Sequence, residues 1–117
     1  MLELKVRDYD SAKAVVISLF GKVDTQGTET LRGKLNEYLE KDTISKIIIN
    51  FSECDFITSV GLGMLVGAQK NAKENGKALR FYELHKNIES IFKITNLYAF
   101  FDVRESEEKA LNDWGVK

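Results

Sequence analysis

The feature that most constrains the fold of this chain is an alternation between short β-branched runs and longer segments with helical periodicity. The apolar runs at residues 15–20 and 47–51 are each a few residues long, which is typical of buried strands. Between them, residues 28–41 place Leu31, Leu35 and Leu39 at helical spacing among charged residues. Strands and helices that alternate in this way predict an α/β fold.

The remaining segments extend this alternation. Residues 2–7, LELKVR, alternate apolar and charged side chains and predict a half-buried strand that forms a hairpin with residues 15–20. We expect further strands at residues 77–84 and 100–103, and further helices at residues 59–75, 87–95 and 106–114. The expected order is β-β-α-β-α-β-α-β-α, a mixed and mostly parallel sheet with about four helices. Periodicity leaves open whether all the helices cover the same face.

Length and composition narrow the possible functions. The chain has 117 residues, which predicts one domain over residues 1–117, and its net charge of −1 gives no general attraction to nucleic acid or to an anionic membrane. We find neither a long apolar run for a membrane span nor a signal-peptide layout, and we therefore expect a cytoplasmic protein without membrane insertion. Cys54 and His85 are the only cysteine and histidine. We therefore expect no metal site, no cofactor and no catalytic triad.

The stretch DFITSVGLGMLVGAQ at residues 55–69 is the most unusual part of the sequence. It places two hydroxyls, Thr58 and Ser59, before a predicted helix that contains Gly61, Gly63 and Gly67. Each glycine inside a helix costs about 1 kcal/mol relative to alanine, so this composition needs a compensating role.

A helical projection separates the residues of this stretch into two faces. One face is apolar and is expected to pack on the sheet, with small residues along its flank; it consists of Gly61, Leu62, Leu65, Val66, Ala68 and Ala72. The opposite face is small and partly apolar where charged residues are usual, which favours a protein-binding surface; it consists of Val60, Gly63, Met64, Gly67 and Asn71.

Two roles are open for Ser59. It could cap the helix by accepting a backbone hydrogen bond, a role that Thr58 could also fill. Alternatively, Ser59 could accept a phosphoryl group, which the positive end of the helix tolerates and which would oppose a partner packed against Val60 and Met64. At the start of the first helix we expect Thr25 to be the cap, with Asp24 adding negative charge.

Two enzyme-like interpretations find little support. The glycines of GLGMLVG lie within the helix and lack the spacing of a dinucleotide-binding loop, and no P-loop lysine follows them. Asp24 and Asp55 have no basic partner in a recognisable catalytic arrangement, so loop hydrogen bonds are the better interpretation.

Three segments in this order resemble the STAS family, in particular the anti-sigma factor antagonists of bacteria. They are FGKVDTQGTETL at residues 20–31, DFITSVGLGMLVGAQK at residues 55–70, and SEEKAL at residues 106–111. The resemblance covers nearly the whole chain. It implies the STAS fold.

The resemblance also implies a partner switch. In the family, the unphosphorylated antagonist binds an anti-sigma factor that is also a serine kinase, and phosphorylation ends this binding until a PP2C-type, metal-dependent phosphatase reverses it. By alignment the acceptor is Ser59, with Thr58 as a less favoured second hydroxyl. Asp24 borders the acceptor. The expected partner-binding residues are Asp24, Thr58, Ser59, Val60, Gly61, Gly63, Met64 and Gly67.

One departure from the family keeps a second function open. Thr58 stands where these antagonists usually have an aspartate. The alternative is therefore a STAS subunit that is never phosphorylated and serves a membrane transport or other regulatory complex. A nucleotide-binding protein or an enzyme of flavodoxin-like shape is a third hypothesis, for which the required motifs are missing.

Overall fold

The strands and helices follow one another along the chain in the predicted order. The structure is a computed structural model that describes residues 1–116. The five strands are β1 (Glu3–Tyr9), β2 (Ala14–Phe20), β3 (Lys46–Glu53), β4 (Ala78–Tyr82) and β5 (Asp102–Arg104). The four α-helices are α1 (Thr25–Leu39), α2 (Ser59–Glu74), α3 (Lys86–Ile94) and α4 (Glu107–Asn112). A short 3-10 turn, Asp10–Ala12, joins β1 to β2.

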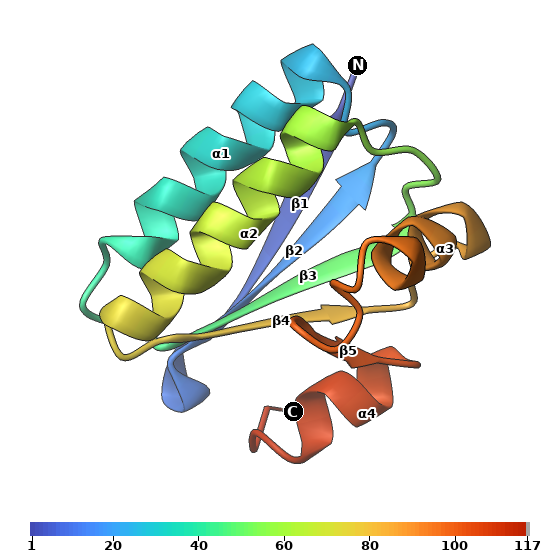
Figure 1. Cartoon of the computed structure of the whole chain (residues 1–117). Helices are drawn as coiled ribbons and strands as arrows, with labels where there is room; N and C mark the ends of the chain where they lie inside the picture. Colours follow the sequence, from blue (N-terminus) through green and yellow to red (C-terminus); the bar gives the residue numbers. More distant parts are fainter. Residues whose placement is uncertain (117) are drawn as a thin grey trace.

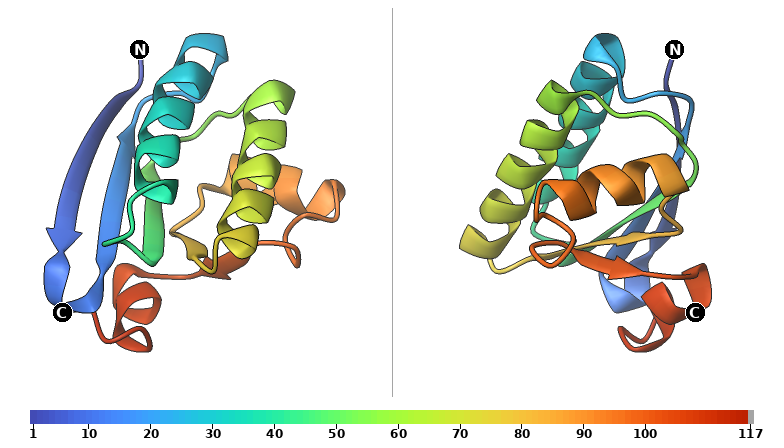
Figure 2. Two further views of the ribbon diagram at one scale, coloured as in Figure 1. Left: turned by 90° about the vertical axis from the view of Figure 1, so that its left-hand side faces the viewer. Right: turned by 45° about the vertical axis from the view of Figure 1, so that its right-hand side comes forward.

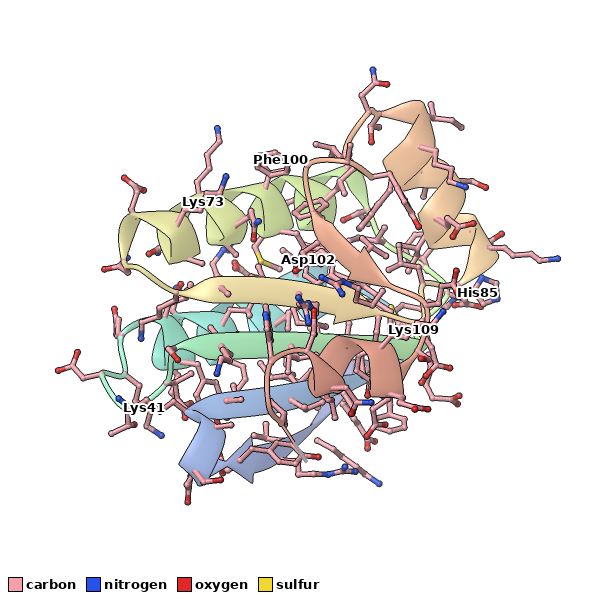
Figure 3. All side chains as sticks on the ribbon, turned by 90° about the horizontal axis from the view of Figure 1, so that it is seen from below. Lys41, Lys73, His85, Phe100, Asp102 and Lys109 are labelled. Carbon is pink, nitrogen blue, oxygen red and sulfur yellow. The ribbon has the colours of Figure 1, made fainter. Side chains whose placement is uncertain are left out.

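The strands form one mixed sheet in the order β1-β2-β3-β4-β5 (Figure 1). β1 is antiparallel to β2, and the other neighbouring pairs are parallel. The predicted hairpin followed by parallel strands is therefore confirmed. All parallel strands end at the same edge of the sheet, where Figure 3 shows His85; Lys41 lies at the opposite end of the molecule.

The main core lies between the sheet and helices α1, α2 and α3. Inward residues of the strands, such as Ile17 and Ile49, pack there with Leu35 and Leu65 of the helices. α1 and α2 run side by side over the sheet and begin at the same end (Figures 1 and 2). This arrangement brings the predicted partner-binding helix next to the start of α1.

The last helix covers the opposite face of the sheet, which the sequence had left open. Ala110 and Leu111 of α4 pack there with Val16 and Ile48, whose side chains alternate with those of the main core. Trp114 was predicted to belong to this helix, but α4 ends at Asn112. Trp114 follows the helix, and its partly buried ring packs against this second core and over a buried arginine of the sheet.

That arginine, Arg80 of β4, is only 2% exposed and lies beneath α4. It forms ion pairs with Asp113 at 2.6 Å and Asp102 at 2.9 Å, and it donates a hydrogen bond to the carbonyl oxygen of Ala110 at 2.7 Å. Its guanidinium carbon lies 3.6 Å from the centre of the Trp114 ring. α4 is therefore attached to the sheet by charged groups as well as by apolar contacts.

A strand was predicted at residues 100–103, but the observed strand β5 begins later, at Asp102. Phe101 lies in the turn before β5, where its ring centre is 4.9 Å from that of Phe81 and 5.1 Å from that of Phe92. The side chain closes the core from this turn. Its apolar character therefore reflects burial rather than a place in the strand.

Candidate functional site

The two loops that precede α1 and α2 are joined by backbone hydrogen bonds. Val23 and Ile57 form a parallel bridge, in which the Val23 nitrogen donates to the Phe56 oxygen at 2.9 Å and the Thr58 nitrogen donates to the Val23 oxygen at 3.0 Å. Both bridge residues are buried. The start of α1 and the start of α2 are therefore held at a fixed spacing.

Asp24 caps α1. Its carboxylate oxygen accepts a hydrogen bond from the Gly27 nitrogen at 2.8 Å, and its carbonyl oxygen accepts one from the Thr28 nitrogen at 2.7 Å. The prediction that Thr25 is the cap was wrong. The backbone of Asp24 is extended, as a cap requires, whereas Thr25 is already the first helical residue and is exposed.

Thr58 caps α2. Its hydroxyl oxygen accepts a hydrogen bond from the Gly61 nitrogen at 3.0 Å, and the Leu62 nitrogen donates to its carbonyl oxygen at 2.9 Å. The hypothesis that Ser59 is the cap was therefore wrong. Ser59 is the first residue inside the helix, and its side chain is exposed to solvent. The cap role belongs to Thr58, so it places no demand on the Ser59 hydroxyl.

Gly61 allows a close approach between α2 and α1. A side-chain carbon at this position would lie 2.9 Å from the Thr28 hydroxyl oxygen, 2.9 Å from a Val23 methyl and 3.0 Å from the Ile57 Cγ1 methylene. Side-chain carbons are almost never found this close to other atoms. The predicted close approach is thus present, but toward α1 and the two loops rather than the strands. Gly61 was predicted to be a partner-binding residue, but it is buried and therefore not available to contact a partner.

The outer face of α2 is open, as the projection predicted. Val60 is 61% exposed, and no atom lies within 4 Å of where a side chain on Gly63 or Gly67 would begin. Met64 differs from these residues because it is partly buried against the core. The open face is therefore formed by Val60 and the two glycines, with Met64 at its border.

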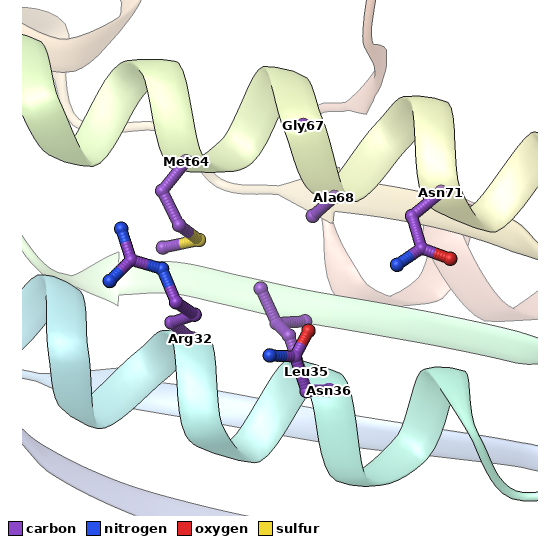
Figure 4. Close-up of a pocket in the computed structure, with 7 residues that line it drawn as sticks. All are labelled: Arg32, Leu35, Asn36, Met64, Gly67, Ala68 and Asn71. Atoms are coloured by element: carbon purple, nitrogen blue, oxygen red, sulfur yellow. The ribbon is translucent and has the colours of Figure 1, made fainter.

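A shallow groove of about 210 Å³ runs between α1 and α2 beside this face (Figure 4). Its residues are Arg32, Leu35, Asn36, Met64, Gly67, Ala68 and Asn71. Part of the set predicted from the helix face thus lines the groove, together with residues of α1 that the sequence pattern had not connected to it.

Sequence reasoning missed Phe56, which lies three residues before Ser59 and is 42% exposed. The Lys22 ammonium lies 5.2 Å from the centre of the Phe56 ring and 3.5 Å from the Asp55 carboxylate. The sequence carried no signal for this exposure, because an aromatic residue between Asp55 and Ile57 is equally compatible with the core; the burial of Cys54 and Ile57 on either side is seen only in the structure.

The sequence-family model of the STAS domain matches residues 3–110, which is nearly the whole chain. The chain belongs to the STAS domain family. The resemblance seen in the sequence is confirmed, and the mixed sheet with four helices in residues 1–116 is the fold that the resemblance implied. The match leaves open which partner this STAS domain binds.

Known proteins similar to this STAS domain include regulators of sigma factors. An anti-sigma-B factor antagonist from Listeria monocytogenes is 27% identical over 106 residues, which is 91% of this chain and 90% of that protein. The anti-sigma factor antagonist SpoIIAA, in its unphosphorylated form, has a TM-score of 0.71 at 20% identity over 97% of this chain and 96% of its own. A second structure shows SpoIIAA from Bacillus in the phosphorylated form, with a TM-score of 0.71 at 22% identity over 97% and 98%.

The same fold also occurs in a transporter family. The structure of a sulfate transporter family protein from Wolinella succinogenes has a TM-score of 0.77 at 15% identity, covering 88% of this chain and 85% of that chain. At such identities the structural likeness shows the fold alone.

Cys54 and His85 follow the ends of the parallel strands β3 and β4. Burial raises the pKa of the Cys54 thiol above its ordinary value, which disfavours the reactive thiolate. His85 is exposed and caps α3 by accepting a hydrogen bond from the Asn87 nitrogen at 3.2 Å. Within residues 1–116, no group of three acidic, histidine or cysteine side chains is placed to hold a metal ion. None of the helices in the same residues is long and apolar enough to span a membrane.

Proposed function

We propose that this chain is an anti-sigma factor antagonist controlled by phosphorylation of Ser59. In its unphosphorylated form it binds an anti-sigma factor that is also a serine kinase, and a sigma factor is thereby released. The kinase then phosphorylates Ser59 and binding ends. A PP2C-type phosphatase restores the binding form. The chain acts by contact rather than by catalysis, in the cytoplasm where sigma factors work.

The observation that carries this proposal is the division of roles between Thr58 and Ser59. The Thr58 hydroxyl oxygen is engaged as the cap of α2, and its side chain is only partly exposed, so it is less accessible to a kinase. Ser59 is exposed at the first helical position, where the positive end of the helix favours an added negative charge. We therefore assign the acceptor to Ser59 rather than to Thr58.

The surroundings of Ser59 support a switch of binding rather than a switch of fold. Val60 and Gly63 lie on the open face of α2, directly beside the acceptor. A phosphoryl group at Ser59 would bring about −1.5 to −2 charges to the edge of this apolar face. A partner packed there would have to desolvate that charge, so its affinity falls while α2 stays folded.

The test mixes the purified chain with each serine-kinase anti-sigma factor encoded in the source genome, with and without ATP. We expect binding without ATP and, with ATP, one phosphoryl group that mass spectrometry maps to Ser59. Ser59→Ala should bind and remain unphosphorylated. Ser59→Asp should weaken binding by about 2–3 kcal/mol, whereas the matched control Ser90→Asp, on the solvent-exposed side of α3, should bind like the wild type.

A second candidate is a STAS subunit of a membrane transport complex that is never phosphorylated. The observation that favours it is Thr58 in place of the usual aspartate; the STAS fold, which a sulfate transporter family protein shares, is compatible with it. This candidate would be favoured over the first if no candidate kinase placed phosphate on Ser59 and if Ser59→Asp bound the anti-sigma factors no differently from the wild type.

A further inference from the structure

We propose that the sheet face opposite α1 and α2 carries a binding site for a small carboxylic acid. Its carboxylate is held by Lys5, Ser18 and Asn50, and its apolar part lies against Phe20. The proposed function assigns no role to this face of the sheet. The inference therefore goes beyond that function and is independent of the phosphorylation of Ser59.

α4 covers only part of this face of the sheet. Its apolar residues pack over Val16 and Ile48. The next residues that point the same way along these strands, Ser18 and Asn50, are half-buried and line a hollow of about 380 Å³. The complete lining consists of Lys5, Val6, Arg7, Ser18, Phe20 and Asn50. Central parallel strands are usually apolar throughout, so polar residues within β2 and β3 indicate a specific role for this hollow.

Three polar side chains of the lining lie in one row across the sheet. Lys5 is the direct neighbour of Ser18 in the antiparallel pair β1 and β2, and Ser18 is the direct neighbour of Asn50 in the parallel pair β2 and β3. Neighbouring strands are about 4.8 Å apart, and side chains that lie opposite each other point to the same face. One small polar group can therefore contact all three residues.

Hydrogen bonds within this row leave only donors free. The Asn50 side-chain oxygen accepts a hydrogen bond from the Ser52 backbone nitrogen at 2.9 Å, and the Asn50 amide nitrogen donates to the Ser18 hydroxyl oxygen at 3.1 Å. The Ser18 hydroxyl proton and the second amide proton of Asn50 have no acceptor among residues 1–116. Two adjacent free donors suit the two oxygens of a carboxylate.

Lys5 supplies the positive charge that favours an anion. Among residues 1–116 no carboxylate forms an ion pair with its ammonium, whereas Arg7 is paired with Glu107 at 3.5 Å and donates to the Tyr9 hydroxyl at 2.9 Å. Glu3 is exposed on the same face but does not line the hollow. The lining thus has one unpaired positive charge, which matches a singly charged carboxylate better than a doubly charged phosphate.

Phe20 provides apolar surface beside these donors. It follows Ser18 on the same face of β2 and is half-buried. The centre of its ring lies 5.1 Å from the Lys5 ammonium, so the charge and the apolar surface adjoin. A carboxylate on a short apolar stem can therefore contact the donors and cover the ring at the same time, as is usual in small-molecule sites.

The test titrates the full chain, labelled with ¹⁵N, with 3-phenylpropionate and follows the amide resonances by NMR. We expect saturable shifts centred on Lys5, Ser18, Phe20 and Asn50, with a Kd of about 1 mM or tighter for a probe of this size. The uncharged 3-phenylpropanamide has the same shape and should bind at least about tenfold more weakly. Equal binding of acid and amide, or no saturable shift at these residues, would overturn the inference.

Variants of the row test which groups hold the carboxylate. Asn50→Asp keeps the oxygen that accepts from Ser52 but adds a negative charge, so it should weaken binding at least about tenfold. Lys5→Met keeps the stem and should weaken binding about fivefold to tenfold, whereas Lys5→Arg should stay within about threefold of the wild type. The matched control is Lys86→Met, an exposed lysine of α3, which should bind like the wild type.

The variants at Lys5 keep the test decisive if Asn50→Asp lowers the thermal unfolding temperature, because Lys5 is exposed. Equal affinities of Lys5→Met and Lys86→Met would contradict the role of the ammonium. Inorganic phosphate is the second probe, and it should shift the same resonances at least about tenfold more weakly than 3-phenylpropionate. Tighter binding of phosphate than of the acid would contradict a carboxylate site.

Discussion

The hydroxyl oxygen of Thr58 accepts a hydrogen bond from the backbone nitrogen of Gly61 at 3.0 Å, and this contact closes the first turn of α2. Ser59, the next residue, lies inside the helix with its side chain in solvent. Two adjacent hydroxyls therefore have separate roles. Loss of the first should change the stability of the chain, and loss of the second should change only its surface.

Thr58→Ala should lower the free energy of unfolding by about 1 kcal/mol, because the Gly61 N–H loses its partner. Ser59→Ala is the matched control and should stay within about 0.5 kcal/mol of the wild type, since its side chain is exposed. Urea unfolding followed by circular dichroism measures both. Equal losses in the two variants would show that the cap is shared between them.

Alanine at two glycines of α2 should have opposite effects. Gly61→Ala should destabilise the chain by about 1–3 kcal/mol, because the new carbon would meet Thr28, Val23 and Ile57 at no more than 3.0 Å. Gly63→Ala should stabilise it by up to about 1 kcal/mol, since nothing lies within 4 Å and alanine favours the helix. Thermal unfolding of the two variants distinguishes these outcomes. A stabilising Gly61→Ala would contradict the close approach of α2 to α1.

Replacement of Arg80 should weaken the attachment of α4. Arg80→Met keeps most of the apolar stem but leaves Asp102 and Asp113 without their buried partner, so we expect a loss of about 2–4 kcal/mol in the free energy of unfolding. We expect a value in the lower half of this range, because both carboxylates are partly exposed to solvent. Arg104→Met, which removes a half-exposed arginine from the same carboxylates, is the control and should cost at most about 1 kcal/mol.

Asp113 should make stability depend on pH in the acidic range. Hydrogen bonds from Arg80 hold the pKa of the Asp113 carboxyl below its ordinary value of 3.8, and the charge of Arg104 adds to this effect. A carboxyl with a lowered pKa in the folded state stabilises the chain above its unfolded pKa, and this contribution is lost as the pH falls through the folded pKa. The urea midpoint of the wild type should therefore decrease more steeply below about pH 4 than that of Asp113→Asn. Parallel curves for the two proteins would contradict the predicted linkage.

The helices show how far periodicity carries a prediction. The apolar spacing around Leu62 and Leu65 placed the second helix at residues 59–75, and the structure has it at Ser59–Glu74. The periodicity of the first helix was recognised over residues 28–41 and its cap was expected at Thr25, but the helix begins at Thr25 because the Asp24 carboxylate caps it. Periodicity reports the middle of a helix, where side chains face the core. The ends depend on individual hydrogen bonds.

The candidate site was found from the sequence in its residues but not in its roles. The pattern singled out Thr58, Ser59 and the outer glycines of α2, and all of them lie at the start or on the open face of that helix. Which hydroxyl caps the helix depends on a backbone turn that is extended at Thr58 and helical at Ser59. Composition cannot distinguish two adjacent residues that are both suited to the cap.

The sequence by itself determined the order of strands and helices, the mixed sheet and the membership of the STAS domain family, because these follow from local periodicity and from motifs read along one chain. Only the tertiary structure decided that Gly61 faces Thr28, that α4 covers the opposite face of the sheet over Arg80, and that Phe56 projects beside Lys22. Each of these contacts joins segments that are far apart in the sequence. Their geometry is set by how the two loops and the helices pack together, which no local pattern records.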